Sequence, residues 1–225
     1  DFTASDIRYV SQPDFVGTEF HISGKYDMEV RLGIPGLFNV VNALAAVSVC
    51  GFLNLDKERI RHALEHIRVN GRMEIVYTSA RCTVLVDYAH NAVSMESLLE
   101  TLREYHPKRL VVVFGCGGNR SKDRRYSMGE IGGRMADLSI ITADNSRFEK
   151  VEDIIADIRG SIEKTGGKFI EIPDRKEAIT YSITHAEQGD MIAIIGKGHE
   201  DYQEINGVRY PFLDRAVVEE VVKNL

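Results

Sequence analysis

The sequence LVVVFGCGGNR, residues 110–120, joins a continuous apolar run to a glycine-rich turn and a basic side chain. A run that is apolar at every position is typical of a strand buried on both faces in a parallel sheet. Four further apolar runs lie before and after it in the sequence. They are VLV at 84–86, LSIIT at 138–142, FIEI at 169–172 and MIAII at 191–195.

The stretches between these runs have apolar residues at helical spacing, which predicts a helix after each of the first four strands. Residues 73–77, joined to 82–87 by a three-residue turn, predict an antiparallel strand at the sheet edge. Strands and helices in alternation indicate a doubly wound α/β architecture. We therefore predict a Rossmann-like domain over residues 71–225, with a mostly parallel sheet and one antiparallel edge strand.

The first 70 residues follow a different pattern. Alternating apolar residues between 15 and 31 predict a β-hairpin. Residues 37–53 are too long for a strand and apolar nearly all round, which predicts a buried helix. A second, amphipathic helix over 56–69 ends at Asn70-Gly71, a strong stop signal. We therefore place a domain boundary near residue 70.

The composition limits the classes of function. The 225 residues are 44% apolar and 28% charged, as in ordinary globular proteins. The net charge is −6 and the basic residues are scattered, which argues against nucleic-acid binding and favours small-molecule partners. No apolar run is long enough to cross a membrane. Three widely spaced cysteines suit neither disulfides nor zinc, so we expect a cytoplasmic protein.

Residues with charged, polar or imidazole side chains follow each predicted strand. They lie at the edge of the sheet where ligands of open α/β folds bind. These segments are DYAHN at 87–91, GCGGNR at 115–120, DNSR at 144–147, PDR at 173–175 and GKGHE at 196–200. Four basic residues beside the glycine turn favour a carboxylate or phosphate pocket, namely Arg120, Lys122, Arg124 and Arg125.

Simpler interpretations of each segment remain open. The glycine turn lacks the G-x-G-x-x-G spacing of a dinucleotide site and suits a tight turn. His90 and Asn91 suit the start of a helix, and Arg147 suits a local salt bridge. The G-x-S-x-G and H-E-x-x-H motifs are absent, which argues against the hydrolase and zinc-protease classes that they mark.

Six motifs, taken in order, resemble the C-terminal part of the Mur ligase family, and within it the ligases that add the third peptide residue to a cell-wall precursor. The motifs are FNVVNALAA at 38–46, GRME at 71–74, DYAHN at 87–91, GCGGNR at 115–120, DNSR at 144–147 and GKGHEDYQ at 196–203. The resemblance implies that residues 1–70 end a central ATP-binding domain and that residues 71–225 form the amino-acid-binding domain.

The resemblance also implies a reaction and its partners. ATP, with Mg²⁺, would phosphorylate a carboxylate of a UDP-N-acetylmuramoyl dipeptide, and the incoming amine would attack the acyl phosphate to form an amide. By the family pattern Asn42 and Arg72 contact the adenine nucleotide and Asp87 contacts its ribose. No catalytic residue is assigned, although His90 is a candidate.

The family's amino-acid pocket maps onto Arg120, Asp144, Asn145, Ser146, Arg147, Gly196 and Glu200. Arginines would pair with carboxylates, and Glu200 with an ammonium. These charges favour meso-diaminopimelate over L-lysine, whose distal ammonium Arg147 would repel. Ser146 stands where the family usually has Pro, which predicts a somewhat looser loop with the same charge pairing. Two other departures from the family pattern are Asn119 in place of Asp and Ala92 in place of Pro.

No G-x-x-x-x-G-K-[ST] phosphate loop occurs in the sequence. We therefore expect a C-terminal fragment that is inactive by itself and that exposes apolar surface on the helix over 37–53. Other hypotheses remain open: a lysine-adding ligase, a ligase like folylpolyglutamate synthase, a non-catalytic amino-acid-binding module, and an unrelated nucleotide-binding domain.

Overall fold

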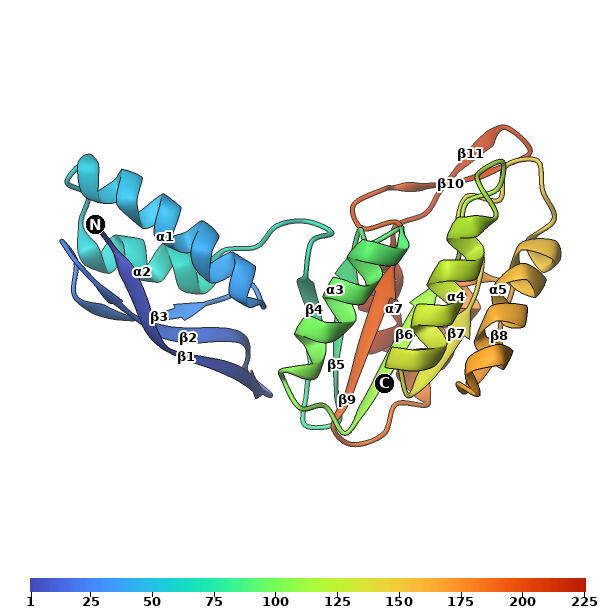
Figure 1. The fold of residues 1–225 in the computed structure, drawn as a ribbon, viewed down its shortest axis with the longest axis horizontal. Helices are drawn as coiled ribbons and strands as arrows, with labels where there is room; N and C mark the ends of the chain where they lie inside the picture. Colours follow the sequence, from blue (N-terminus) through green and yellow to red (C-terminus); the bar gives the residue numbers. More distant parts are fainter. The chain divides into compact units, whose positions relative to one another are not determined.

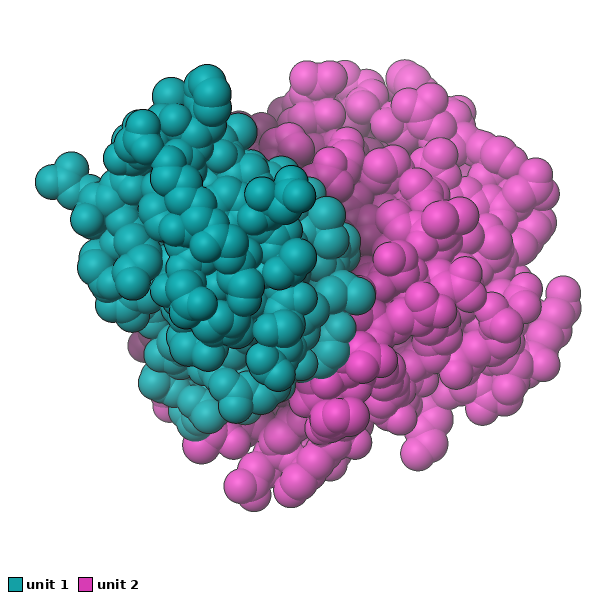
Figure 2. Space-filling view, turned by 60° about the vertical axis from the view of Figure 1, so that its left-hand side comes forward, with its two compact units in different colours: residues 1–69 teal, residues 70–225 magenta.

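The computed structural model describes all 225 residues, which form two compact units, Asp1–Val69 and Asn70–Leu225 (Figures 1 and 2). The first unit contains a three-stranded antiparallel sheet and two helices. In chain order these are β1 (Thr3–Gln12), β2 (Phe15–Ser23), β3 (Met28–Leu32), α1 (Leu37–Phe52) and α2 (Lys57–His66). The predicted hairpin and both predicted helices are therefore confirmed.

The core of the first unit lies between the hairpin and the two helices. Phe20 and Ile22 of β2 are fully buried and share one apolar cluster with Val40 and Val47 of α1 and Leu64 of α2. Strand β1 was not predicted. Its register with β2 shifts between Ser5 and Arg8, and such a bulge breaks the period-two alternation that marks a strand in sequence.

The helix over 37–53 is predicted to be buried, and in this unit the prediction is wrong for one of its sides. Only one side of α1 is buried in this unit, through Val40, Ala43, Val47 and Gly51. The other side exposes large apolar residues: Leu37, Phe38, Val41, Val49 and Phe52. This agrees with the separate expectation that the helix carries exposed apolar surface.

The second unit is built on a six-stranded sheet in the order β4-β5-β9-β6-β7-β8. Its strands are β4 (Glu74–Thr78), β5 (Cys82–Asp87), β6 (Arg109–Phe114), β7 (Leu138–Ile141), β8 (Phe169–Glu171) and β9 (Asp190–Ile195). β4 pairs with β5 antiparallel and all other neighbours are parallel. The predicted α/β fold with one antiparallel edge strand is confirmed.

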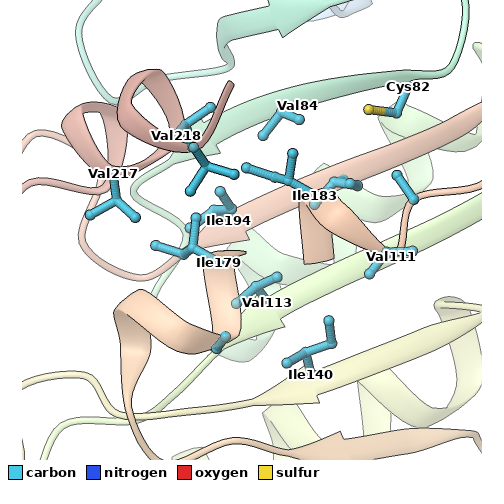
Figure 3. Close-up of a cluster of buried hydrophobic side chains, with 14 of the residues drawn as sticks. Cys82, Val84, Val111, Val113, Ile140, Ile179, Ile183, Ile194, Val217 and Val218 are labelled. Carbon is cyan, nitrogen blue, oxygen red and sulfur yellow. The ribbon is translucent and has the colours of Figure 1, made fainter. Parts of the chain in front are cut away.

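Helices cover both faces of this sheet (Figure 1). They are α3 (Ala92–Arg103), α4 (Asp123–Met135), α5 (Val151–Thr165), α6 (Arg175–Thr184) and α7 (Asp214–Lys223). Figure 3 shows the core on one face, where Ile179 and Ile183 of α6 and Val218 of α7 meet Val84 and Ile194 of the strands. The continuous apolar runs in the strands reflect burial on both faces.

Two helices that follow strands, α3 and α6, begin at polar N-cap residues. The Asn91 side chain accepts a hydrogen bond from the backbone N–H of Ser94, and Asp174 accepts one from that of Glu177. Each cap satisfies an N–H group that the first helical turn leaves unpaired. The N-cap role considered for Asn91 is therefore present.

No helix or strand is predicted from the sequence after residue 200. There the chain forms a hairpin of β10 (Tyr202–Ile205) and β11 (Val208–Pro211), followed by α7. Asn206 and Gly207 at the turn both have positive φ, 50° and 76°. An Asn-Gly pair is a strong hairpin signal, so the information was present in the sequence. None of the helices has the length and apolar character needed to span a membrane.

Candidate functional site

A cavity of about 290 Å³ opens at the carboxyl ends of β5, β6, β7 and β9. It contains six of the seven predicted amino-acid-binding residues and also His90. The six are Arg120, Asp144, Asn145, Arg147, Gly196 and Glu200. Ser146 does not line the cavity and is buried, at 2% exposure.

The Asn145 side chain forms hydrogen bonds with three residues that follow β9. Its Nδ2 donates to Glu200 Oε2 at 3.0 Å, while its Oδ1 accepts from Lys197 Nζ at 3.2 Å and from the Glu204 backbone N–H at 2.9 Å. Because Asn145 is only 4% exposed, these bonds fix its amide orientation. Asn145 therefore joins the loop after β7 to the loop after β9.

Glu200 is held as an anion on one side of the cavity. Burial alone would raise the pKa of its carboxyl, but the hydrogen bond from Asn145 and the charge of Lys197 outweigh burial and lower that pKa. Lys197 Nζ lies 3.2 Å from Glu200 Oε2, and the lysine is fully buried. Lys197 is absent from the predicted site, although a lysine between two glycines at a strand end had signalled a role beyond packing.

The arginines of the cavity differ in how far they are already paired. Arg147 has φ +52°, donates from Nη1 to the Gly118 carbonyl at 2.9 Å and lies 3.5 Å from Glu204 Oε2. Arg120 and Arg124 also line the cavity, and neither has an ion pair within the chain. The cavity therefore presents two guanidinium groups that are available to an anion.

The other two basic residues predicted beside an anion are engaged elsewhere. Arg125 is 1% exposed, and its Nη2 contacts both Glu149 oxygens at 2.8 Å while its Nη1 contacts Asp157 at 2.9 Å. Lys122 pairs with the same Asp157 at 3.1 Å. The prediction that all four basic residues surround an anion is therefore wrong for Lys122 and Arg125, because acidic residues of the next loop and helix neutralise them.

Gly196 lies where a side chain would close the cavity. Its φ of +110° is a conformation that residues with a Cβ rarely adopt. A Cβ at this position would lie 2.6 Å from Asp144 Oδ2. The close approach keeps the backbone after β9 against the Asp144 carboxylate.

The residues predicted to bind a nucleotide are divided between the units. Asp87 is buried, and its carboxylate accepts the backbone N–H groups of Ala89 at 2.7 Å and Met73 at 2.8 Å. Burial raises the pKa of Asp87, while these two bonds and Arg72 oppose the rise. Arg72 is exposed, with its guanidinium carbon 4.6 Å from the centre of the Tyr88 ring. Asn42 is exposed on α1 of the first unit and donates to Asn39 Oδ1 at 3.2 Å.

His90 is exposed at the edge of the cavity. One ring nitrogen, Nδ1, lies 2.8 Å from the Tyr88 carbonyl oxygen, and the ring meets that of Tyr88 edge-on with centroids 4.8 Å apart. The structure therefore gives His90 a position at the site but no acidic partner. No group of three or more His, Cys, Asp or Glu side chains is arranged to hold a metal ion.

Comparison with known proteins identifies the family. The model of the Mur ligase glutamate ligase domain matches residues 71–198. Two curated relatives, both named UDP-N-acetylmuramoyl-L-alanyl-D-glutamate–2,6-diaminopimelate ligase, are similar over most of this chain. The one from Caldanaerobacter subterraneus is 44% identical, over 86% of this chain and 40% of the relative. The one from Aquifex aeolicus is 41% identical, over 93% of this chain and 43% of the relative.

Solved structures agree. A ligase of the same name has a TM-score of 0.78 and 34% identity, covering all of this chain and 45% of its own. Folylpolyglutamate synthase from Thermotoga maritima shares the fold at 22% identity, with a TM-score of 0.62 over 85% of this chain and 42% of its own. The chain thus spans less than half the length of these relatives. The matched domain, the sequence identity and the fold together show that the chain belongs to the Mur ligase family.

Proposed function

We propose that this chain is the C-terminal part of an ATP-dependent ligase that joins meso-diaminopimelate to UDP-N-acetylmuramoyl-L-alanyl-D-glutamate in peptidoglycan synthesis. Residues 1–70 would end its central ATP-binding domain, and residues 71–225 would bind the amino acid. The observation that carries the proposal is the cavity, in which Arg120, Arg147 and Glu200 lie together at one sheet edge. Relatives named for this reaction support it.

The charges in the cavity favour an amino acid with a carboxylate at each end. Arg120 has no partner in the chain, and Arg147 has only a carbonyl and one carboxylate at 3.5 Å, so both can take up carboxylates. Asp144 and Glu200 supply negative charge for an ammonium. Lysine lacks the distal carboxylate and would bring its ammonium toward a guanidinium, which costs binding free energy.

In the proposed reaction, an oxygen of the dipeptide carboxylate attacks the γ-phosphorus of ATP and ADP leaves. The amine of the amino acid then attacks the acyl phosphate carbon, and inorganic phosphate leaves as the amide forms. The residues of this chain would bind and orient the amine, which lowers the entropic part of the barrier. Arg72 and Asp87, with Asn42, would contact the nucleotide.

Mg²⁺ would shield phosphate charge during this transfer. The acidic side chains of this chain form no cluster that suits the ion, so the residues that would hold it lie outside the groups that line the cavity. His90, which is exposed and lines the cavity, would be a candidate proton carrier.

The test is ligation by the full-length gene product. ADP release is measured with ATP and the UDP-linked dipeptide, with meso-diaminopimelate or L-lysine as the acceptor. Arg147→Ala should lower kcat/KM for diaminopimelate by at least about tenfold, because a charge-assisted hydrogen bond is lost. Arg159→Ala, which removes an exposed guanidinium on α5, is the matched control and should have no effect.

The outcomes separate the remaining hypotheses. Equal rates with L-lysine would overturn meso-diaminopimelate as the proposed substrate but would leave the proposed ligase activity standing. Turnover with a folate and glutamate instead would favour the synthase that shares the fold. Binding of diaminopimelate without any ADP release in the full-length protein would indicate a non-catalytic module.

A further inference from the structure

Tyr88 lies between the two groups of site residues in the second unit. Its ring packs against the Arg72 guanidinium, whose carbon is 4.6 Å from the ring centre. Its hydroxyl donates to Glu200 Oε1 at 3.4 Å. The first contact reaches a residue proposed to bind nucleotide, and the second reaches one proposed to bind the amino acid. The Tyr88 side chain therefore joins the two groups of residues.

Backbone packing holds the three segments together. Gly71 precedes Arg72, and a Cβ there would overlap the backbone of Gly198 and His199. A Cβ at Gly198 would in turn lie 2.8 Å from the Cβ of Tyr88. Because neither glycine has a side chain, the turn that carries Arg72 and the loop that carries Glu200 both reach Tyr88.

The Tyr88 hydroxyl controls an oxygen of Glu200 that nothing else holds. Asn145 and Lys197 both donate to Oε2, and Tyr88 is the only donor to Oε1. Burial and the charge of Glu200 raise the pKa of Tyr88, so the hydroxyl keeps its proton at neutral pH. Oε1 is the oxygen left to receive a substrate ammonium, and its direction depends on Tyr88.

The contact is also sensitive to small movements. The distance of 3.4 Å is longer than the roughly 2.5–3.0 Å that is usual between a hydroxyl and its acceptor oxygen, so a shift of a few tenths of an ångström would tighten the contact or break it. The ring is confined by Arg72 and by the rings of His90 and His199, with centroids 4.8 and 5.3 Å away. A nucleotide that moves Arg72 would therefore move the ring and its hydroxyl.

We propose that Tyr88 is a positioning residue that couples nucleotide binding to amino-acid binding. Its hydroxyl aims Glu200 Oε1 at the ammonium of the amino acid, and its ring transmits the position of Arg72. The inference rests on the proposed function. Coupling of this kind is reciprocal, so ATP changes the affinity for the amino acid by the same factor as the amino acid changes that for ATP.

Two substitutions in the full-length enzyme separate the hydroxyl from the ring. Tyr88→Phe keeps the ring and should raise KM for meso-diaminopimelate by about tenfold, while KM for ATP, measured with the amino acid well below its own KM so that the reciprocal coupling does not contribute, changes little. Tyr88→Leu removes both contacts and should raise both KM values. Tyr126→Phe is the matched control, because Tyr126 lies on the exposed surface of α4 away from the cavity.

A second measurement excludes a purely structural role. Tyr88→Phe should have no further effect on the amino-acid KM in a Glu200→Gln background, because the two changes remove one interaction. The binding constant of diaminopimelate, titrated with and without a non-hydrolysable ATP analogue, should respond to the analogue in the wild type and not in Tyr88→Leu.

The results distinguish the inference from the function on which it rests. If the wild type ligates and Glu200→Gln raises the amino-acid KM but Tyr88→Phe does not, the inference is wrong and the proposed function stands. Additive effects of the two substitutions would also overturn it. If the wild type fails to ligate diaminopimelate at all, both are wrong.

Discussion

Arg175 and Asp214 form an ion pair in which both side chains are completely buried. Nε lies 2.7 Å from Oδ1, and Nη2 lies 2.8 Å from Oδ2. The same guanidinium donates to the carbonyl oxygens of Ala143 at 3.1 Å and Ile195 at 3.0 Å. These carbonyls immediately precede Asp144 and Gly196, so the pair ties the first turns of α6 and α7 to the strand ends that carry the cavity.

Removing one member of this pair should destabilise the protein strongly. Asp214→Ala leaves a buried guanidinium without its counter-charge, and we expect a loss of about 3–5 kcal/mol in the free energy of unfolding. Urea denaturation of this chain, followed by far-UV circular dichroism, measures it. Asp153→Asn on the exposed side of α5 is the control and should change stability by less than about 0.5 kcal/mol. A similar loss of stability in both variants would contradict the stabilising role of the buried ion pair.

Low pH should lower the stability of the second unit, because Arg125 forms ion pairs with two carboxylates. Hydrogen bonds from Arg125 lower the pKa of Glu149, and those from Arg125 and Lys122 outweigh burial and lower the pKa of Asp157. A carboxyl with a lowered folded-state pKa stabilises the fold above its unfolded value, and this contribution is lost as the pH falls through the folded value. We therefore expect stability to decline below the ordinary values of 4.5 for Glu and 3.8 for Asp.

Thermal unfolding from pH 7 to pH 3 measures that decline. Arg125→Leu should be less stable at neutral pH and should also show a shallower loss on acidification, because the two carboxyls then titrate nearer their ordinary values. Arg134→Leu, which changes an exposed guanidinium on the same helix, should keep the wild-type slope. An unchanged slope in Arg125→Leu would show that other groups cause the acid sensitivity.

Much of this site was predictable because it depends on strand ends. Continuous apolar runs located β5, β6, β7 and β9, and parallel strands place the residues that follow them at one edge. That reasoning needs only local sequence. It placed Arg120, Asn145 and Glu200 at one sheet edge, where they line one cavity, whereas the pocket that also included Ser146 was implied by the family resemblance.

The pairing of charges was not predictable in the same way. Arg120 and Arg125 are five residues apart and equally basic in sequence, yet only Arg125 is buried between Glu149 and Asp157. Those partners come from segments more than 20 residues away, and local patterns carry no signal for such contacts. The exposed side of α1 was missed for a similar reason. The apolar composition of a helix shows that it can be buried, but it does not show which part of the protein covers it.

Gly196→Ala should lower the stability of the protein and distort the cavity more than replacement of a glycine usually does. The added Cβ would meet Asp144 Oδ2 at 2.6 Å at a φ of +110°, so the loop after β9 must move. We expect a loss of about 1–3 kcal/mol in stability and, under the proposed function, a raised KM for the amino acid in the full-length protein. Gly160→Ala is the matched control, because nothing lies within 4 Å of a Cβ there. In α5 it should stabilise slightly, by about 0.5–1 kcal/mol.

Lys197 gives a final test of how the amino-acid side of the cavity is organised. Lys197→Met keeps much of the buried volume but removes the donor to Asn145 Oδ1 and the cation beside Glu200. Because that cation helps to lower the pKa of Glu200, the pKa of the carboxyl should rise in the variant, and the folded state should become less stable at neutral pH than the wild type.

The carboxyl signal of Glu200 in an NMR titration, assigned with Glu200→Gln, reports the pKa directly. Under the proposed function, Lys197→Met in the full-length protein should also raise KM for meso-diaminopimelate, because Asn145 and Glu200 lose the contact that fixes their relative orientation. If the pKa of Glu200 stays where it is in the wild type, Asn145 and Tyr88 hold the carboxylate without the lysine. The buried cation would then serve the packing of the loop against Tyr202, over whose ring it lies at 5.3 Å.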